Sequence, residues 1–292
     1  MTVQGLTIIG ERINPGFKST KELFENDDLS GIQELARRQA VAGADYLNVN
    51  IGSRALRDPA FMKEVIQAIQ DVVDLPLSFD FPNIEVQAIC LETYDIEKAA
   101  GRKPIVNSIS ETRWEMLELL SIRPFKVILM ASERVEDGVG RANKFSTEVA
   151  LVAKRMTEKL MSGHGLLADD IFVDVSISAL ASDTEGLLQM AIEGIKAISE
   201  DPSMRGVHLS GGLSNIGQQL PAKAADGSEL KSRIERAFLT LARPYGFDTV
   251  LGTPWKRYEP LSPGDPLLAQ FERIISARGV DAMRLVRKLY RG

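Results

Sequence analysis

Short apolar runs alternate with longer amphipathic stretches along the chain. The runs have the length of buried strands, and the stretches between them repeat their apolar residues with the period of a helix. The expected strands are residues 6–10, 45–51, 75–79, 104–106, 126–130, 171–173, 206–209 and 249–251. The expected helices are residues 31–42, 59–72, 84–99, 111–121, 146–162, 184–199, 231–245 and 266–277.

Strict alternation of strand and helix predicts a parallel sheet with right-handed crossovers. Eight such units favour an α/β fold of the closed (β/α)8 type, the TIM barrel, over an open doubly wound sheet. The open sheet would favour a G-x-G-x-x-G loop after the first strand, but residues 10–16 read Gly-Glu-Arg-Ile-Asn-Pro-Gly. No repeat or Pro-rich linker divides the chain, so residues 1–292 are expected to form a single domain.

The composition narrows the possible partners. Apolar residues make up 44% and charged residues 26% of the chain, which is the balance of a soluble globular protein. The 40 acidic residues outnumber the 35 basic ones, and no Lys/Arg-rich run could neutralise several phosphates, so nucleic acid is not an expected partner. The sequence shows neither a membrane-spanning run nor a signal peptide at its start, and we expect a cytoplasmic protein that does not bind a membrane.

Cysteine and histidine are scarce. The one cysteine, Cys90, lies in an apolar pattern and is expected to be a small buried side chain. Of the two histidines, His208 lies in an expected strand and is interpreted as structural, while His164 is interpreted as an exposed residue at a helix end. These three residues cannot build the usual zinc sets, so no metal is expected.

Polar side chains gather at the ends of the expected strands. In a TIM barrel the site is built at the carboxyl ends of the strands. Two carboxylates and several amides there suit a flat heterocycle with an amino-pyrimidinone edge, because Asp accepts from ring N–H groups and Asn both donates and accepts. A pterin carries this edge. The polar residues are Glu11, Arg12, Asn14, Asn48, Asn50, Asp80, Asn107, Ser108, Asp174, Ser210, Ser214, Asn215 and Thr253.

Purely structural roles compete with binding at several of these positions. Helix capping is the first interpretation for three residues that precede expected helices, namely Asn83, Ser110 and Asp183. Asn14 and Asn107 could instead form turns with their own backbone. Asp80 and Asp174 each follow an apolar strand, and a carboxylate in that position must be paired or bound to a ligand.

Seven short motifs occur at these strand ends and in the first helix. They are Gly-Glu-Arg-Ile-Asn at 10–14, Ala-Arg-Arg-Gln at 36–39, Asn-Ile-Gly at 50–52, Ser-Phe-Asp at 78–80, Val-Asn-Ser at 106–108, Val-Asp at 173–174 and Gly-Leu-Ser-Asn at 212–215. In this order they resemble the pterin-binding methyltransferases that act on methyltetrahydrofolate and a corrinoid protein. That family resembles dihydropteroate synthase in fold and pterin pocket, and the resemblance covers nearly the whole chain.

The resemblance implies roles for individual residues. Asp80, Asn107 and Asp174 would hold the pterin ring, and Asn215 would be the catalytic residue near N5, the atom that bears the methyl group. Further substrate-binding residues at the same mouth are expected to be Glu11, Asn14, Asn50 and Ser214. Relatives often have an acid where this chain has Asn48, so a role that depends on that acid is not expected here.

The resemblance also implies the substrates and partners. Tetrahydrofolate or its methyl derivative would be the substrate, and a partner protein would supply the corrinoid, because the chain lacks the Asp-x-His-x-x-Gly corrinoid motif. A homodimer is expected as well. Dihydropteroate synthase stays an alternative because Lys256 and Arg257 follow the last expected strand. A folate-binding barrel without catalysis is the other alternative.

Overall fold

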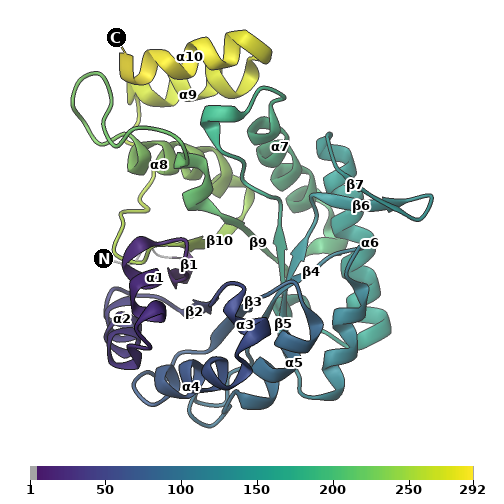
Figure 1. The fold of residues 1–292 in the computed structure, drawn as a ribbon. Coiled ribbons are helices and arrows are strands. Elements are labelled where there is room, and N and C mark those ends of the chain that lie inside the picture. Colours follow the sequence, from purple (N-terminus) through teal and green to yellow (C-terminus); the bar gives the residue numbers. More distant parts are fainter. Residues whose placement is uncertain (1–4, 292) are drawn as a thin grey trace.

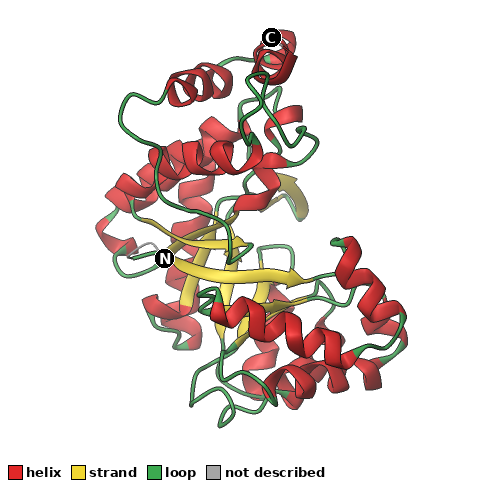
Figure 2. Cartoon of the chain, turned by 90° about the vertical axis from the view of Figure 1, so that its left-hand side faces the viewer, coloured by secondary structure: helices red, strands yellow, loops and turns green. Residues whose placement is uncertain are grey.

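The computed structural model describes residues 5–291; residues 1–4 and 292 of the expected domain lie outside the described residues. Eight parallel strands form a closed barrel in the order β1-β10-β9-β8-β5-β4-β3-β2, with helices around it (Figures 1 and 2). The barrel strands are β1 (Thr7–Ile13), β2 (Tyr46–Val49), β3 (Leu77–Asp80), β4 (Ile105–Ile109), β5 (Lys126–Met130), β8 (Ile171–Asp174), β9 (His208–Gly212) and β10 (Phe247–Gly252). The predicted (β/α)8 barrel is therefore confirmed.

The first strand closes the barrel by pairing with both the last strand and the second. Thr7 lies opposite Thr249 of β10, and Ile9 lies opposite Tyr46 of β2. Strand ends that are far apart in the sequence therefore meet at one mouth. The helices are α1 (Lys18–Glu25), α2 (Leu29–Val41), α3 (Arg54–Arg57), α4 (Pro59–Gln70), α5 (Ile84–Thr93), α6 (Ser146–His164), α7 (Leu187–Glu200), α8 (Lys231–Ala242), α9 (Pro266–Ser276) and α10 (Gly279–Arg291).

The core has two parts. Apolar residues on the outward faces of the strands pack against the helices in one large cluster, which includes Val106 and Val127. Ile105, Ile128 and Phe172 belong to a second, separate cluster of buried strand residues. Because neighbouring residues of a strand point to opposite faces, this second cluster fills the barrel interior.

Most predicted elements agree with the structure, but two of the predicted helices differ from it. The expected helix 84–99 ends at Thr93 in α5, and the expected helix 111–121 is a 3₁₀ helix, Trp114–Ser121. Asn83 caps α5 as predicted, since its side chain accepts from the N–H of Val86. The capping interpretation of Ser110 is wrong, because its hydroxyl contacts Thr112 and the helix begins later.

A hairpin and the helix α10 are among the elements that the sequence patterns did not predict. Strands β6 (Glu133–Glu136) and β7 (Val139–Ala142) form an antiparallel hairpin that projects from the molecule (Figure 1). β7 is exposed along its whole length. Because neither of its faces is buried, its sequence need not alternate apolar and polar residues, and the strand could not be predicted from such a pattern. Helix α10 contacts α9, and it buries residues with helical spacing, namely Ala282, Val286 and Leu289.

The minor predictions for cysteine and histidine agree with the structure. Cys90 is fully buried, and burial raises the pKa of its thiol. His164 is the exposed last residue of α6. Across residues 5–291, no helix combines the length and apolar character needed to cross a membrane.

Candidate functional site

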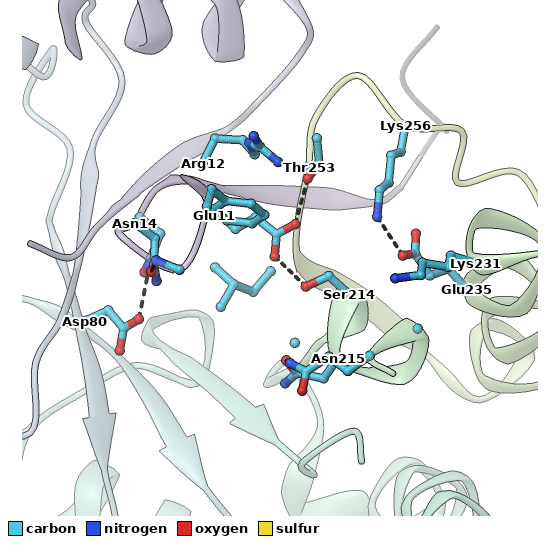
Figure 3. A pocket seen from close by; sticks show the side chains of 17 residues that line it. Glu11, Arg12, Asn14, Asp80, Ser214, Asn215, Lys231, Glu235, Thr253 and Lys256 are labelled. Atoms are coloured by element: carbon cyan, nitrogen blue, oxygen red, sulfur yellow. Dashed lines mark hydrogen bonds and ion pairs between the residues drawn. The ribbon is translucent and has the colours of Figure 1, made fainter. Parts of the chain in front are cut away.

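A cavity of about 690 Å³ opens among residues at the carboxyl ends of β1, β2, β3, β9 and β10 and at the start of α8 (Figure 3). This is the size of a small-ligand pocket, at the mouth where TIM barrels bind their ligands. The predicted site residues that line it are Glu11, Asn14, Asp80, Ser214 and Asn215. Asn50, Asn107 and Asp174 do not line this cavity, although they lie at or just beyond the carboxyl ends of their strands.

Glu11 joins three strand ends. Its side chain is buried at 6% exposure, and its two carboxylate oxygens accept separate hydrogen bonds. Oε2 accepts from the hydroxyl of Ser214 at 2.6 Å, and Oε1 accepts from the hydroxyl of Thr253 at 2.7 Å. Glu11 therefore holds the segments after β9 and β10 against β1, and its predicted contact with a substrate stays a prediction.

Three side chains form a chain of hydrogen bonds from β2 to β4. The buried amide of Asn48 donates to Asp80 at 3.3 Å, and its oxygen accepts from the amide of Asn107 at 3.4 Å. Burial raises the pKa of Asp80, while the amides of Asn48 and Asn50 and the charge of Arg113 oppose the rise. An acid at position 48 would face Asp80 with a like charge, whereas Asn48 gives it a donor. Asn48, which itself lines the cavity, thus links Asn107 to Asp80.

The two other asparagines near this mouth shape the backbone. Asn14 accepts from the N–H of Gly16 at 2.8 Å, which confirms the turn-forming interpretation, and it also lines the cavity. Asn50 accepts from the N–H of Gly52 at 2.7 Å and donates to the backbone carbonyl of Asp80 at 2.9 Å. It therefore supports the end of β3, where Asp80 lies.

Asp174 lies apart from this cavity at the end of β8. Its carboxylate accepts from the N–H of Ser176 at 2.7 Å, and burial raises its pKa to about 6. In the described part of the chain no side chain pairs with this carboxylate, so the backbone N–H of Ser176 is its hydrogen-bond partner. The predicted roles of Asp80, Asn107 and Asp174 in holding a pterin stay predictions.

Asn215 lies on the other side of the cavity from Asp80 (Figure 3). It is exposed, and its side-chain oxygen accepts from the amide of Gln218 at 2.8 Å. Gly212 makes room for it, because a Cβ at that position would lie 2.8 Å from Nδ2 of Asn215. An exposed amide on the wall of a cavity can reach a bound ligand, and its catalytic role stays a prediction.

Charged residues that the sequence patterns did not single out also line the cavity. Glu235 on α8 is 1% exposed, and its Oε1 accepts from the ammonium of Lys256 at 2.6 Å. Its Oε2 is buried, and no residue in the described range donates to it. Lys231, at the start of α8, lines the same wall. In the sequence, Glu235 could have been recognised as an acid at one of the buried, otherwise apolar positions of the helix.

Two further predictions, helix capping by Asp183 and the lack of a metal site, concern residues outside the mouth cavity. The carboxylate of Asp183 accepts from the N–H groups of Gly186, Leu187 and Leu188, so its predicted capping of the following helix is confirmed. Between residues 5 and 291 no three His, Cys, Asp or Glu side chains come together as a candidate metal site.

A closed (β/α)8 barrel with buried carboxylates and amides at one mouth defines a class of proteins that bind polar small molecules there. Residues 10–251 match the family model described as pterin binding enzyme, and the chain belongs to this family. It is 29% identical over 259 residues to a methylcorrinoid:tetrahydrofolate methyltransferase of Eubacterium limosum, which covers 86% of each chain.

Solved structures show the same fold. A dihydropteroate synthase of Xanthomonas albilineans with 4-aminobenzoic acid matches with a TM-score of 0.57 at 18% identity, covering 87% of this chain and 90% of that one. A dihydropteroate synthase of Coxiella burnetii in complex with pteroic acid matches with a TM-score of 0.56 at 17% identity, covering 94% of each chain.

Proposed function

We propose that this protein transfers a methyl group between N5 of methyltetrahydrofolate and the cobalt of a corrinoid that a separate protein carries. The observation that carries the proposal is the likeness to a methylcorrinoid:tetrahydrofolate methyltransferase over 86% of both chains. The exposed amide of Asn215 on the wall of the mouth cavity supports it further.

Recognition of the pterin would use the carboxylates and amides at this mouth. Asp80 would accept hydrogen bonds from ring N–H or amine groups, and Asn107 would add a donor or an acceptor. Asp174 has a half-buried carboxylate with no side-chain partner among the described residues, so ring donors would stabilise its charge. Glu11, Asn14, Asn50 and Ser214 would contact the substrate at the same mouth, and their hydrogen bonds would keep the surrounding loops in place.

The chemical step requires charge at N5. A tertiary amine is a poor leaving group unless N5 gains a proton or positive charge on the way to the transition state, so the enzyme must stabilise that charge. The side-chain oxygen of Asn215 would accept from protonated N5 directly or through an ordered water. Its existing hydrogen bond from Gln218 orients that oxygen.

A corrinoid protein would dock over the mouth, where its cobalt would accept or give the methyl group. The homodimer, the cytoplasmic location and the single domain of residues 1–292 stay predictions.

The first test replaces Asn215 by Ala. If Asn215 stabilises charge that develops in the transition state, kcat should fall by about 10² to 10³ while the Kd of methyltetrahydrofolate changes little. Stopped-flow methyl transfer to a reduced corrinoid protein measures kcat, and calorimetry on the same variant measures Kd. A near-normal kcat would remove Asn215 from the mechanism.

A matched control is Gln218→Ala, which removes the donor to Asn215 but keeps the amide of Asn215 itself. It should lower kcat much less. If Asn215→Ala weakens methyltetrahydrofolate binding and lowers kcat by similar factors, this residue mainly holds the ring.

The alternatives make different predictions. Lys256 lines the cavity, as a synthase that binds a pyrophosphate would require, but its ammonium is paired with Glu235. An assay with dihydropterin pyrophosphate and 4-aminobenzoate should therefore give no product. Folate binding without turnover in the presence of several corrinoid proteins would indicate a carrier.

A further inference from the structure

The mouth cavity has two chemically different parts. One part holds Asp80 and the amide of Asn48, while another holds Lys231, Lys256 and Glu235 (Figure 3). A ligand that fills the cavity would therefore meet hydrogen-bond acceptors in one region and cations in the other. Glu235 neutralises part of this positive charge through its ion pair with Lys256.

Arg12 adds a third cation that lines the cavity. Its guanidinium stacks on Phe17, 3.8 Å from the ring centroid, and lies 5.5 Å from the ring of Trp255. The Nε atom is buried, and no acceptor bonds it within the described residues. Burial lowers the pKa of Arg12, with Glu11 opposing and Arg38 adding to the shift. The guanidinium is thus oriented by aromatic rings and lacks an anionic partner at its Nε.

Lys231 is the second cation with unused capacity. Its side chain is exposed and lines the cavity. Among residues 5–291 it has no hydrogen-bond or ion-pair partner. Its charge acts on Glu235, which shows that the two side chains are close enough to interact. Lys256 keeps two of its three N–H donors beyond the one given to Glu235.

We propose that Arg12, Lys231 and Lys256 bind the carboxylates of the glutamyl tail of the folate, an inference that rests on the proposed function. Folates consist of a pterin, a 4-aminobenzoyl group and one or more glutamates, so the end opposite the pterin is anionic. With the pterin at Asp80, the opposite end of the ligand extends toward the cations. The protein therefore prefers folates that carry a glutamyl tail over tail-less pteroates.

The test compares three ligands by calorimetry: 5-methyltetrahydropteroate, which lacks glutamate, 5-methyltetrahydrofolate, and its triglutamate. The wild-type protein should bind the monoglutamate about tenfold more tightly than the pteroate. The difference should shrink between roughly 0.05 and 0.5 M NaCl, because salt screens partly exposed charges. Equal affinities for all three ligands at low salt would overturn the tail site while leaving pterin binding intact.

Variants assign the effect to the named cations. Lys231→Ala should weaken monoglutamate binding about fivefold and leave the pteroate affinity unchanged. Lys223→Ala is the matched control, an exposed lysine in the same loop region that does not line the cavity, and it should change neither affinity. Arg12→Gln should reduce the tail preference as well, and the ratio of the two affinities within one variant corrects for structural effects on the pterin end.

Other outcomes would overturn the tail site in distinguishable ways. Unchanged folate affinities in Lys231→Ala and Arg12→Gln, with weaker association of the corrinoid protein, would assign the cations to protein docking. Absence of binding by all three ligands would overturn the proposed function together with the tail site. Tail-dependent binding without methyl transfer would support the tail site and overturn the proposed reaction.

Discussion

The protonation of Asp174, at the end of β8, is linked to the stability of the fold. Burial raises the pKa of its carboxyl from 3.8 to about 6, so the folded protein binds a proton there more tightly than the unfolded chain. The stability linked to that proton is fully present below the unfolded pKa and is lost as the pH rises through about 6. At pH 8 the charged carboxylate is therefore a cost to the free protein.

We therefore expect Asp174→Asn to raise the free energy of unfolding at pH 8 by up to roughly 3 kcal/mol, and by little near pH 4. Asn can keep the hydrogen bond from the N–H of Ser176. Urea unfolding of both proteins at the two pH values measures this. Equal stabilities at pH 8 would contradict the buried charge.

The same variant should bind methyltetrahydrofolate less tightly, because the ring donors lose a charged acceptor. In the wild-type protein the affinity should decrease as the pH falls below about 6, while the variant should lack this step. A pH step that persists in Asp174→Asn would assign the titration to another group.

At the scale of elements, the end of the barrel opposite the mouth holds a network that joins β5, β9, β10 and the segment before β8. His208 at the start of β9 contacts Asp248 on β10 at 2.8 Å and Asp169, which precedes β8, at 3.2 Å. Its ring stacks on Phe172 at 4.7 Å. Lys126 on β5 also donates to Asp169, at 2.7 Å. The structural interpretation of His208 agrees with these contacts.

The pKa of His208 is raised above 6.5, first by the hydrogen bond with Asp248. The charged histidine therefore stabilises the fold fully below pH 6.5, and this contribution is lost as the pH rises through the raised pKa. His208→Gln should cost about 1 kcal/mol more at pH 6 than at pH 8.5, as measured by urea unfolding. Methyl transfer should be unaffected, since the mouth is at the other end. If the loss of unfolding free energy in His208→Gln were the same at both pH values, the charge of His208 would not contribute, and its role would be packing on Phe172.

At the scale of the whole molecule, the site draws on the first and the last strands. Glu11 on β1 bonds Thr253 just beyond β10, and Asp80 ends β3. A ligand in this cavity contacts segments from both ends of the chain, so it binds the closed barrel and not the unfolded chain.

Methyltetrahydrofolate at 100 times its Kd should therefore stabilise the protein by about 2.7 kcal/mol. With an unfolding entropy of about 2.1 cal/mol/K per residue, this raises Tm by roughly 4 °C. Differential scanning fluorimetry with and without the ligand measures the shift. Asp80→Ala at the same ligand concentration should show a smaller shift, and an unchanged Tm in the wild-type protein would argue against folate binding.

The order of apolar and polar residues determined the barrel. Strand and helix periods are local properties, and eight alternating units leave few ways to bury the apolar faces. The same locality let Asn83 and Asp183 be assigned as caps, because a cap bonds the backbone a few residues away. The strand pattern also predicted that Glu11, Asp80, Ser214 and Asn215 meet at one mouth, since parallel strands end on the same side.

Contacts between distant segments were decided only by the tertiary structure. The hydrogen bonds of Asn48 with Asp80 and Asn107 join β2, β3 and β4, and no local pattern encodes their register. The separation of Asp174 from the mouth cavity, and the meeting of Glu235 with Lys256, likewise depend on barrel closure and on the angle at which α8 packs. Periodicity specifies which face of an element is buried, whereas the side chains that meet across that face are set by how all the elements pack together.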